Sequence, residues 1–150
     1  MKILVISLGT RGDVEPLIAT AEILNKKGHE VVCAFSEQFR NEAEKANIPF
    51  VSLGPEFMDV MNSKFAKSVF GGGQSALHTL YANFRLLLLL IKTEKTTIIS
   101  QYNAVEKVNP DIIVHNRFAV YPFLWEWEHP GKTVLLTFSP YVLHYVHGHP

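Results

Sequence analysis

Residues 2–17 read KILVISLGTRGDVEPL, an apolar run, a turn with two glycines and the start of an amphipathic segment. A continuous apolar run such as Lys2–Leu8 is typical of a strand that is covered on both faces. Gly9 and Gly12 allow a tight turn and a close approach of the backbone to a ligand. The stretch therefore predicts a buried strand that turns directly into a helix.

The alternation of strand and helix continues along the chain. Four more apolar runs predict strands, at His29–Phe35, Pro49–Leu53, Asp111–Val114 and Thr133–Phe138. Helical patterns separate the runs, at Val14–Lys27, from Ser36 as a cap to about Ala46, at Ser75–Val108 and at Phe118–Glu128. This order predicts an α/β fold with a doubly wound, Rossmann-like parallel sheet, in the strand order 3-2-1-4-5.

The longest helical pattern has an apolar stripe at helical spacing. We expect this stripe to face the core, and it consists of Leu77, Tyr81, Phe84, Leu88, Ile91, Ile98, Tyr102 and Val105. The pair Thr96-Thr97 is expected to bend or split the helix. The run Leu86–Ile91 is too short to span a bilayer, which needs about 20 apolar residues.

Composition excludes several classes of protein. The chain has 150 residues, 47% of them apolar, which suits one globular domain. It has 14 Lys and Arg against 14 Asp and Glu, so charge gives no argument for binding nucleic acid. Cys33 is the only cysteine, so no disulfide forms within the chain, and we expect a buried thiol in a cytoplasmic protein.

In a doubly wound sheet, ligands bind beyond the carboxyl ends of the strands. That rule selects four loops, Gly9–Asp13, Gly54–Gly73, His115–Phe118 and Ser139–Pro150. The first loop lacks the third glycine of a dinucleotide fingerprint and the Gly-Lys-Ser/Thr of a P-loop, which disfavours a nucleotide-binding oxidoreductase. We expect Asp13 at the N-cap and Pro16 in the first helical turn. From spacing alone, Asp13 is either a helix cap or a functional group.

The opening of the chain resembles the glycosyltransferases that include the sterol glucosyltransferases and the bacterial macrolide and glycopeptide transferases. The resemblance rests on the Gly-Thr-Arg-Gly-Asp-x-x-Pro turn at residues 9–16. Later segments agree with it, namely Gly28-His29-Glu30-Val31, Phe39-Arg40, Ile48-Pro49-Phe50, Leu53-Gly54, residues 109–114 and residues 137–150. Order and spacing are kept over nearly the whole chain.

The resemblance implies one half of a GT-B enzyme, in which an N-terminal domain holds the acceptor and a C-terminal domain holds the nucleotide sugar. The chain has no His-x-Gly-x-Gly-Thr donor motif. We therefore expect a truncated N-terminal acceptor domain that is inactive by itself, without the donor-binding domain. The implied reaction is inverting transfer of a hexose from a UDP- or other nucleotide sugar to a hydroxyl of a lipid, sterol or other hydrophobic molecule.

No cofactor and no metal site are expected, although His144, His147 and His149 form a short His-rich tract. The resemblance also allows peripheral association with a membrane surface. An alternative is a non-catalytic subunit that docks a separate donor-domain chain.

The resemblance points to Asp13 as the catalytic base, because Arg11 stays protonated and cannot accept a proton. Contacts with the acceptor are expected from Arg11, His115, Asn116, Phe118 and Ser139, and contacts with the donor from Gly9, Thr10 and Gly12. His115 either faces the acceptor, where it would share the proton with Asp13, or hydrogen-bonds a neighbouring loop. The apolar residues Phe57, Met58, Met61, Phe65 and Phe70 suit a hydrophobic acceptor and suit a core helix equally.

Overall fold

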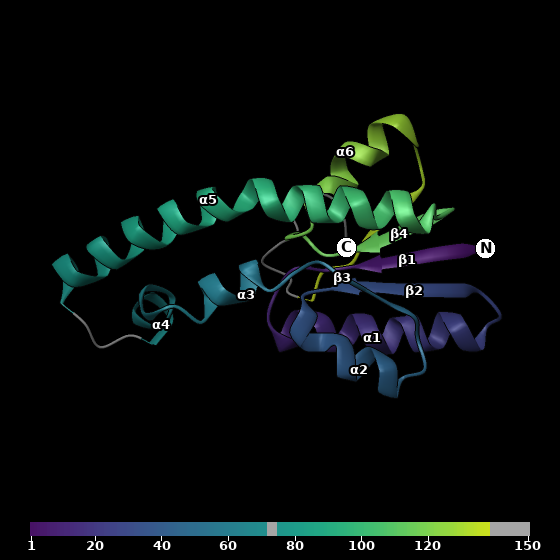
Figure 1. Ribbon diagram of the computed structural model, residues 1–150, viewed down its shortest axis with the longest axis horizontal. Helices are drawn as coiled ribbons and strands as arrows, with labels where there is room; N and C mark the ends of the chain where they lie inside the picture. Colours follow the sequence, from purple (N-terminus) through teal and green to yellow (C-terminus); the bar gives the residue numbers. More distant parts are fainter. Residues whose placement is uncertain (72–74, 139–150) are drawn as a thin grey trace, which may run out of the picture.

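Five parallel strands form the sheet of the computed structural model, which describes residues 1–71 and 75–138 (Figure 1). The strands are β1 (Lys2–Ile6), β2 (Glu30–Phe35), β3 (Phe50–Ser52), β4 (Ile112–His115) and β5 (Thr133–Leu135). Their order is β3-β2-β1-β4-β5, and every neighbouring pair is parallel, as predicted. Four strands lie within their predicted ranges, and β4 extends one residue further, to His115.

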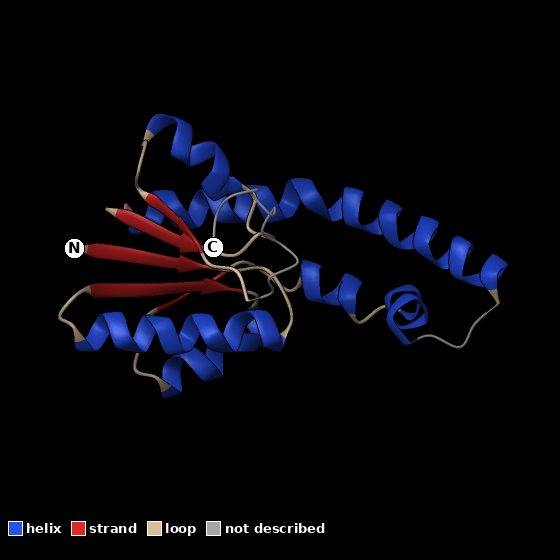
Figure 2. Ribbon diagram, turned by 180° about the vertical axis from the view of Figure 1, so that it is seen from behind, coloured by secondary structure: helices blue, strands red, loops and turns tan. Residues whose placement is uncertain are grey.

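Helices cover both faces of the sheet (Figure 2). One face packs against α1 (Arg11–Lys26), η1 (Glu37–Phe39) and α2 (Arg40–Lys45), and the other against the second half of α5 (Ala76–Val108) and α6 (Tyr121–Glu128). Between β3 and α5 lie α3 (Glu56–Met61) and α4 (Lys64–Gly71). We call α3, α4 and residues 76–92 of α5 the helical arm, because they project together beyond the carboxyl ends of the strands (Figures 1 and 2).

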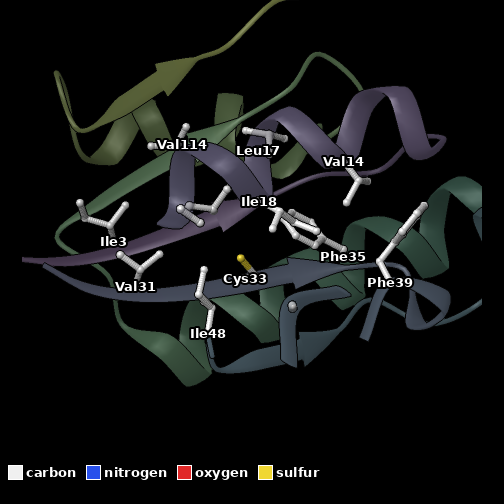
Figure 3. Packing of buried hydrophobic residues seen from close by; sticks show 13 residues of the cluster. Ile3, Val14, Leu17, Ile18, Val31, Cys33, Phe35, Phe39, Ile48 and Val114 are labelled. Carbon is white, nitrogen blue, oxygen red and sulfur yellow. The ribbon is translucent and has the colours of Figure 1, made fainter. Parts of the chain in front are cut away.

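The strands are apolar throughout because their side chains alternate between two cores. Ile3 and Val5 point to the side of α1, where Cys33 and Phe35 of β2 join them (Figure 3). Leu4 of the same strand points to the opposite core. Burial raises the pKa of the Cys33 thiol to about 12, so the thiol is neutral in the folded protein.

The first helix begins at Arg11, three residues before the predicted start. Thr10 is therefore the N-cap and Asp13 lies in the first turn, so the prediction of Asp13 as N-cap is wrong. The Asp13 carboxylate reaches back to the backbone N–H of Thr10, as the third helical residue of a capping box does. Pro16 consequently lies inside the helix rather than in its first turn.

Two other predicted helices differ at their ends. The segment after Ser36 is a 3₁₀ turn followed by the short α2, and the Ser36 hydroxyl caps neither of them. The last helix begins at Tyr121 instead of Phe118, because the side chain of Asn116 accepts a hydrogen bond from the backbone of Ala119 in the preceding turn.

The segment Gly54–Gly73 was predicted to be a loop, but it contains α3 and α4. These helices form because Val60 and Ala66 bury their side chains against Leu86 of α5, in a small core separate from the sheet. Gly71 closes α4, and the rest of the glycine run lies outside the described residues.

The long helix α5 is continuous through Thr96-Thr97, against the predicted bend. The Thr97 hydroxyl donates back to the carbonyl of Glu94 at 2.9 Å and so stays within the helix. The predicted buried stripe is also wrong: Val105 is buried and Ile98 half-buried, but the other six residues are exposed. The buried face consists of Ala82, Leu86, Thr97, Gln101, Ala104, Val105 and Val108. No helix in the described ranges is long and apolar enough to cross a membrane.

Candidate active site

The carboxyl edge of the sheet brings the β1–α1 turn beside the β4–α6 loop. β1 lies in the middle of the sheet, and Ile6 at its end pairs with Ala34 on one side and with His115 on the other. The side-chain amide of Asn116, just after β4, donates a hydrogen bond of 2.7 Å to the carbonyl of Leu8. Asn116 is buried, so this bond holds the two loops in a fixed relation.

The Asp13 carboxylate is held by the residue that caps its helix. Its Oδ2 accepts hydrogen bonds from the backbone N–H of Thr10 at 2.9 Å and from the Thr10 hydroxyl at 3.1 Å. The hydrogen bonds from described residues end on Oδ2, which leaves Oδ1 for another partner. The side chain is half-buried, so a ligand has access to it.

The two glycines of the turn have different surroundings. Gly9 has a φ of 151°, and a Cβ built on it would lie 2.6 Å from Asp13 Oδ2 and 2.7 Å from Asp13 Cβ. The turn therefore requires glycine at position 9, because a side chain would displace the carboxylate. A Cβ on Gly12 would meet only the Thr10 hydroxyl, at 4.0 Å, so the described residues do not require glycine there.

A cavity of about 480 Å³ lies beside the Asp13 carboxylate. It is lined by residues of the β1–α1 turn, α3, α5 and the β4–α6 loop, namely Gly9, Thr10, Asp13, Phe57, Met61, Leu86, Leu90, Arg117 and Phe118. The rings of Phe57 and Phe118 are 6.3 Å apart and connect α3 to the β4–α6 loop. The cavity thus combines one carboxylate and one guanidinium with large apolar side chains, and we call it the apolar pocket.

Four of the predicted site residues, Gly9, Thr10, Asp13 and Phe118, line the apolar pocket together. Sequence reasoning missed Leu86, Leu90 and Arg117. The two leucines are spaced by one helical turn, but five consecutive leucines hide that spacing in the sequence. The Arg117 guanidinium carbon lies 4.5 Å from the ring centre of Phe118, and Arg117 belongs to a loop that the sequence did select.

Arg11 lies on the other side of the turn. Its guanidinium pairs with Glu15 at 3.3 Å and with Glu42 of α2 at 2.9 Å. Arg11 lines a separate, open cavity together with Met58 of α3. Phe57, which precedes Met58 on α3, lines the apolar pocket instead. α3 therefore separates the two cavities, and the structure does not bring Arg11 to the apolar pocket.

His115 is buried at the end of β4 and is not among the residues that line the apolar pocket. Its Nδ1 lies 3.0 Å from the carbonyl oxygen of Asn116, and its ring packs edge-on against Phe123 at 4.7 Å. Burial lowers its pKa, opposed by the Asn116 carbonyl and by the charge of Glu126. These contacts favour the hydrogen-bonding alternative for His115 over contact with an acceptor.

The remaining candidates are placed elsewhere or are not described. Phe65 lines a small cavity between α4 and α5. Ser139, the three closing histidines and the side chain of Phe70 lie outside the described residues.

Comparison with known proteins places these features in a family context. The model of the glycosyltransferase family 28 N-terminal domain matches residues 3–115. A sterol 3-beta-glucosyltransferase of Arabidopsis thaliana is 41% identical over 54 residues, which are 36% of this chain and 9% of that protein. The O-mycaminosyltylonolide 6-deoxyallosyltransferase of Streptomyces fradiae is 38% identical over 50 residues, 33% of this chain and 12% of that protein.

The fold resembles that of solved glycosyltransferases. A glycosyltransferase of Streptomyces sp. SF2575, in complex with thymidine diphosphate, superposes with a TM-score of 0.58 at 21% identity. That match covers 90% of this chain but 38% of the other, so the chain spans well under half of that relative. The likeness shows that the sheet and its helices have the arrangement of a GT-B N-terminal domain.

Proposed function

The chain belongs to the glycosyltransferase family 28 N-terminal domain family, and on that premise we propose that the apolar pocket is the acceptor site of a glycosyltransferase. One observation carries the proposal: the Asp13 carboxylate opens into a cavity whose other walls are largely apolar. Such a cavity fits a hydrophobic molecule with a hydroxyl group directed at Asp13. A lipid, a sterol or a macrolide-like compound meets that description.

In the proposed reaction, Asp13 acts as the general base. Oδ1 accepts the proton of the acceptor hydroxyl while the hydroxyl oxygen attacks the anomeric carbon of the sugar. The new C–O bond forms as the bond from the anomeric carbon to the diphosphate oxygen breaks, and the electron pair leaves with the nucleoside diphosphate. Attack from the side opposite the leaving group inverts the anomeric centre. A positioned base of this kind contributes about 10²–10⁴-fold to the rate.

The hydrogen bonds from Thr10 give Asp13 a fixed orientation for this step. They occupy Oδ2 and leave Oδ1 without a hydrogen bond from a described residue, so the carboxylate loses little freedom when Oδ1 takes the proton. Membership of the capping box and action as a base are therefore compatible roles for the Asp13 side chain.

The proposed donor is a hexose on UDP or another nucleoside diphosphate, and it needs no further cofactor. The thymidine diphosphate in the Streptomyces sp. SF2575 enzyme supports a nucleotide-sugar donor. Gly9, Thr10 and Gly12 would face this donor, with the open space at Gly12 leaving room for the sugar. In the GT-B arrangement a second domain holds the nucleotide, so we expect no sugar transfer by residues 1–150 alone. Peripheral association with a membrane stays a prediction.

The decisive test is Asp13→Asn in a protein that joins this chain to a donor-binding domain, assayed for transfer from nucleotide sugars to sterol and macrolide acceptors. Asparagine keeps an oxygen that can accept the hydrogen bonds from Thr10, so the helix start should survive. We expect kcat to fall by about 10²-fold or more with little change in donor affinity.

Glu15→Gln is the matched control, because Glu15 is a carboxylate two residues away that pairs with Arg11 outside the apolar pocket. This variant should keep normal turnover. Near-normal turnover of Asp13→Asn would show that Asp13 serves only the capping box and that the base lies elsewhere.

The acceptor site itself is testable with the chain alone, by calorimetric titration with a sterol and with a macrolide aglycone. Leu90→Glu places a charge in the apolar pocket and should abolish binding of either probe, whereas Leu88→Glu, on the exposed side of the same helix, should not. Equal binding by the two variants would refute the assignment of the pocket.

A further inference from the structure

The open cavity that Arg11 lines has a volume of about 390 Å³ and lies across α3 from the apolar pocket. We call it the polar cavity. Its walls come from the start of α1, from η1, α2 and α3, which gather at the carboxyl edge of the sheet (Figure 1). Its volume falls in the range of small-molecule sites, about 300–1,000 Å³. The polar residues of its lining are Thr10, Arg11, Gln38, Glu42 and Asn62.

The lining combines hydrogen-bonding groups of several kinds with an apolar wall. Hydroxyl, amide, guanidinium and carboxylate groups can each donate or accept hydrogen bonds toward a ligand. Phe39 and Met58 supply the apolar wall, and both are largely buried. A sugar ring has hydroxyl groups around its edge and C–H groups on its face, so it complements such a lining better than a purely apolar ligand does.

The charges of the polar cavity disfavour an anionic ligand. The Arg11 guanidinium already pairs with two carboxylates, those of Glu42 and Glu15. Glu42 uses its Oε1 for this pair, whereas its Oε2 is buried and has no hydrogen-bond partner among the described residues. A buried carboxylate oxygen requires a hydrogen-bond donor. A ligand hydroxyl supplies that donor, whereas a phosphate group would bring further negative charge to the same place.

The polar cavity touches the apolar pocket only at the β1–α1 turn. Thr10 lines both cavities, and its hydroxyl donates to Asp13 Oδ2 at 3.1 Å. Asp13 itself lines the apolar pocket and not the polar cavity. A sugar in the polar cavity is therefore on the wrong side of the turn to react at the proposed base, so its role is recognition.

We propose that the polar cavity binds a sugar unit that the acceptor already has, while the apolar part of the acceptor occupies the apolar pocket. The acceptor is then an amphiphilic glycoside that reaches from one cavity to the other across Thr10. The place of this ligand in the reaction rests on the proposed function, but the binding of a sugar to the cavity does not.

The first test is titration of the isotope-labelled chain with methyl β-D-glucopyranoside, followed by nuclear magnetic resonance. We expect saturable shifts of the amide signals of Arg11, Gln38 and Asn62, and no such shifts with inorganic phosphate. The double variant Gln38→Met/Asn62→Leu nearly keeps the shapes of the two side chains and removes their hydrogen bonds. It should bind the glucoside at least about tenfold more weakly, since each hydrogen bond contributes about fivefold.

The matched control for the amides is Asn25→Leu/Asn41→Leu. Both asparagines are exposed on helices and neither lines the polar cavity, so this variant should bind the glucoside like the parent. Circular dichroism checks that each variant keeps its helices. Because Gln38 and Asn62 are themselves exposed, we expect the test variant to fold normally.

The carboxylate is tested separately with Glu42→Gln. Glutamine keeps an oxygen for Arg11 but replaces the unpartnered oxygen with a donor, so binding of the glucoside should fall about fivefold. Glu44→Gln, on the outer side of the same helix, is the control and should bind like the parent. A site for anions would behave in the opposite way, because Glu42→Gln would then bind phosphate more tightly.

The link between the two cavities is tested by calorimetry with octyl β-D-glucopyranoside below the concentration at which it forms micelles. Its sugar and its alkyl chain can occupy both cavities at once, so it should bind more tightly than either methyl glucoside or 1-octanol. Leu90→Glu should reduce its affinity to that of methyl glucoside. The variant Gln38→Met/Asn62→Leu should reduce its affinity to that of 1-octanol.

Three results would overturn the proposal. One is the absence of saturable glucoside binding, or its persistence unchanged in Gln38→Met/Asn62→Leu. Another is tighter binding of phosphate than of the glucoside, which would make the cavity an anion site. The third is octyl glucoside that binds no more tightly than 1-octanol. Intact glucoside binding together with normal turnover of Asp13→Asn would refute the proposed function alone.

Discussion

The sheet core and the helical arm are both rich in leucine, isoleucine and valine, but these side chains have opposite surroundings. In the sheet, Leu4 and Val5 are completely buried, one in each of the two cores. In the arm, Leu86 is buried, whereas Leu88, two residues further on, is 44% exposed. Apolar residues are therefore a sufficient signal of burial in one region and not in the other.

The difference arises from the geometry of the two kinds of element. A strand between two layers of helices buries both of its faces, so every position in the apolar run has the same requirement. A helix has more directions around its axis than one layer of neighbours can cover. In α5, apolar residues occupy both sides, and polar Thr97 and Gln101 lie on the buried one, so the hydropathy of the sequence does not show which side packs.

Thiol labelling should give the largest contrast between the two regions. Cys33 lies in the sheet core with a pKa raised to about 12, so its thiolate fraction at neutral pH is roughly a thousandfold below that of an unperturbed thiol. In the variant Cys33→Ser/Leu88→Cys, the thiol at the exposed position 88 of α5 should react as fast as a cysteine in an unfolded peptide. Rapid labelling of Cys33 in the native protein would contradict a closed sheet core.

Leucine truncation should separate the regions in stability. Leu4→Ala should lower the free energy of unfolding by about 2–5 kcal/mol, because it leaves a cavity between the sheet and α5. Leu88→Ala should change it by less than about 0.5 kcal/mol, as exposed positions do. Urea denaturation measures the free energy of unfolding of both variants. Leu86→Ala should lose an intermediate amount, because Leu86 belongs to a smaller core than Leu4 does. A large loss of unfolding free energy in Leu88→Ala would mean that another part of the protein covers Leu88.

The two glycines of the β1–α1 turn should differ in their effect on stability. Gly9→Ala should destabilise the protein by roughly 1–3 kcal/mol, since its Cβ would overlap Asp13 in a backbone conformation that favours glycine. Gly12→Ala should be neutral or stabilising by up to about 1 kcal/mol, because alanine favours the helix. Equal losses in thermal denaturation would show that the open space at Gly12 is filled.

The smallest expected effect is the pH dependence from His115. Burial lowers its pKa in the folded chain, so protons bind preferentially to the unfolded chain below the ordinary histidine pKa of about 6.5. This contribution to stability is complete above that pH and is lost as the pH falls, by at most about 1.4 kcal/mol per unit.

Urea denaturation from about pH 7 to about pH 5 should show this loss in the parent and a shallower loss in His115→Gln. Identical slopes for the two proteins would show that His115 does not contribute.

The sequence did predict that Gly9, Thr10 and Asp13 belong to one candidate site, because the turn's glycines, its carboxylate and its place after a buried strand are all local features. Phe118 was predictable for the same reason, since it lies in a loop at the carboxyl edge. The roles of Arg11 and His115 were not, because they depend on partners distant in sequence or on packing: Glu42 holds Arg11, and Phe123 covers His115. Leu86 and Leu90 could not be selected from five consecutive leucines.

The parallel sheet and the turn that presents Asp13 follow from the amino-acid sequence alone, because continuous apolar runs and glycine positions are local constraints. Right-handed crossovers leave a handful of strand orders for a doubly wound sheet, and the predicted order is one of them. Three features depend on how the elements pack together: which side of α5 is buried, the division of two cavities by α3, and the approach of Arg117 to the apolar pocket. Those outcomes depend on where separate elements come together, and the physical reason is that burial is a property of a neighbourhood in space, which hydropathy along one helix does not specify.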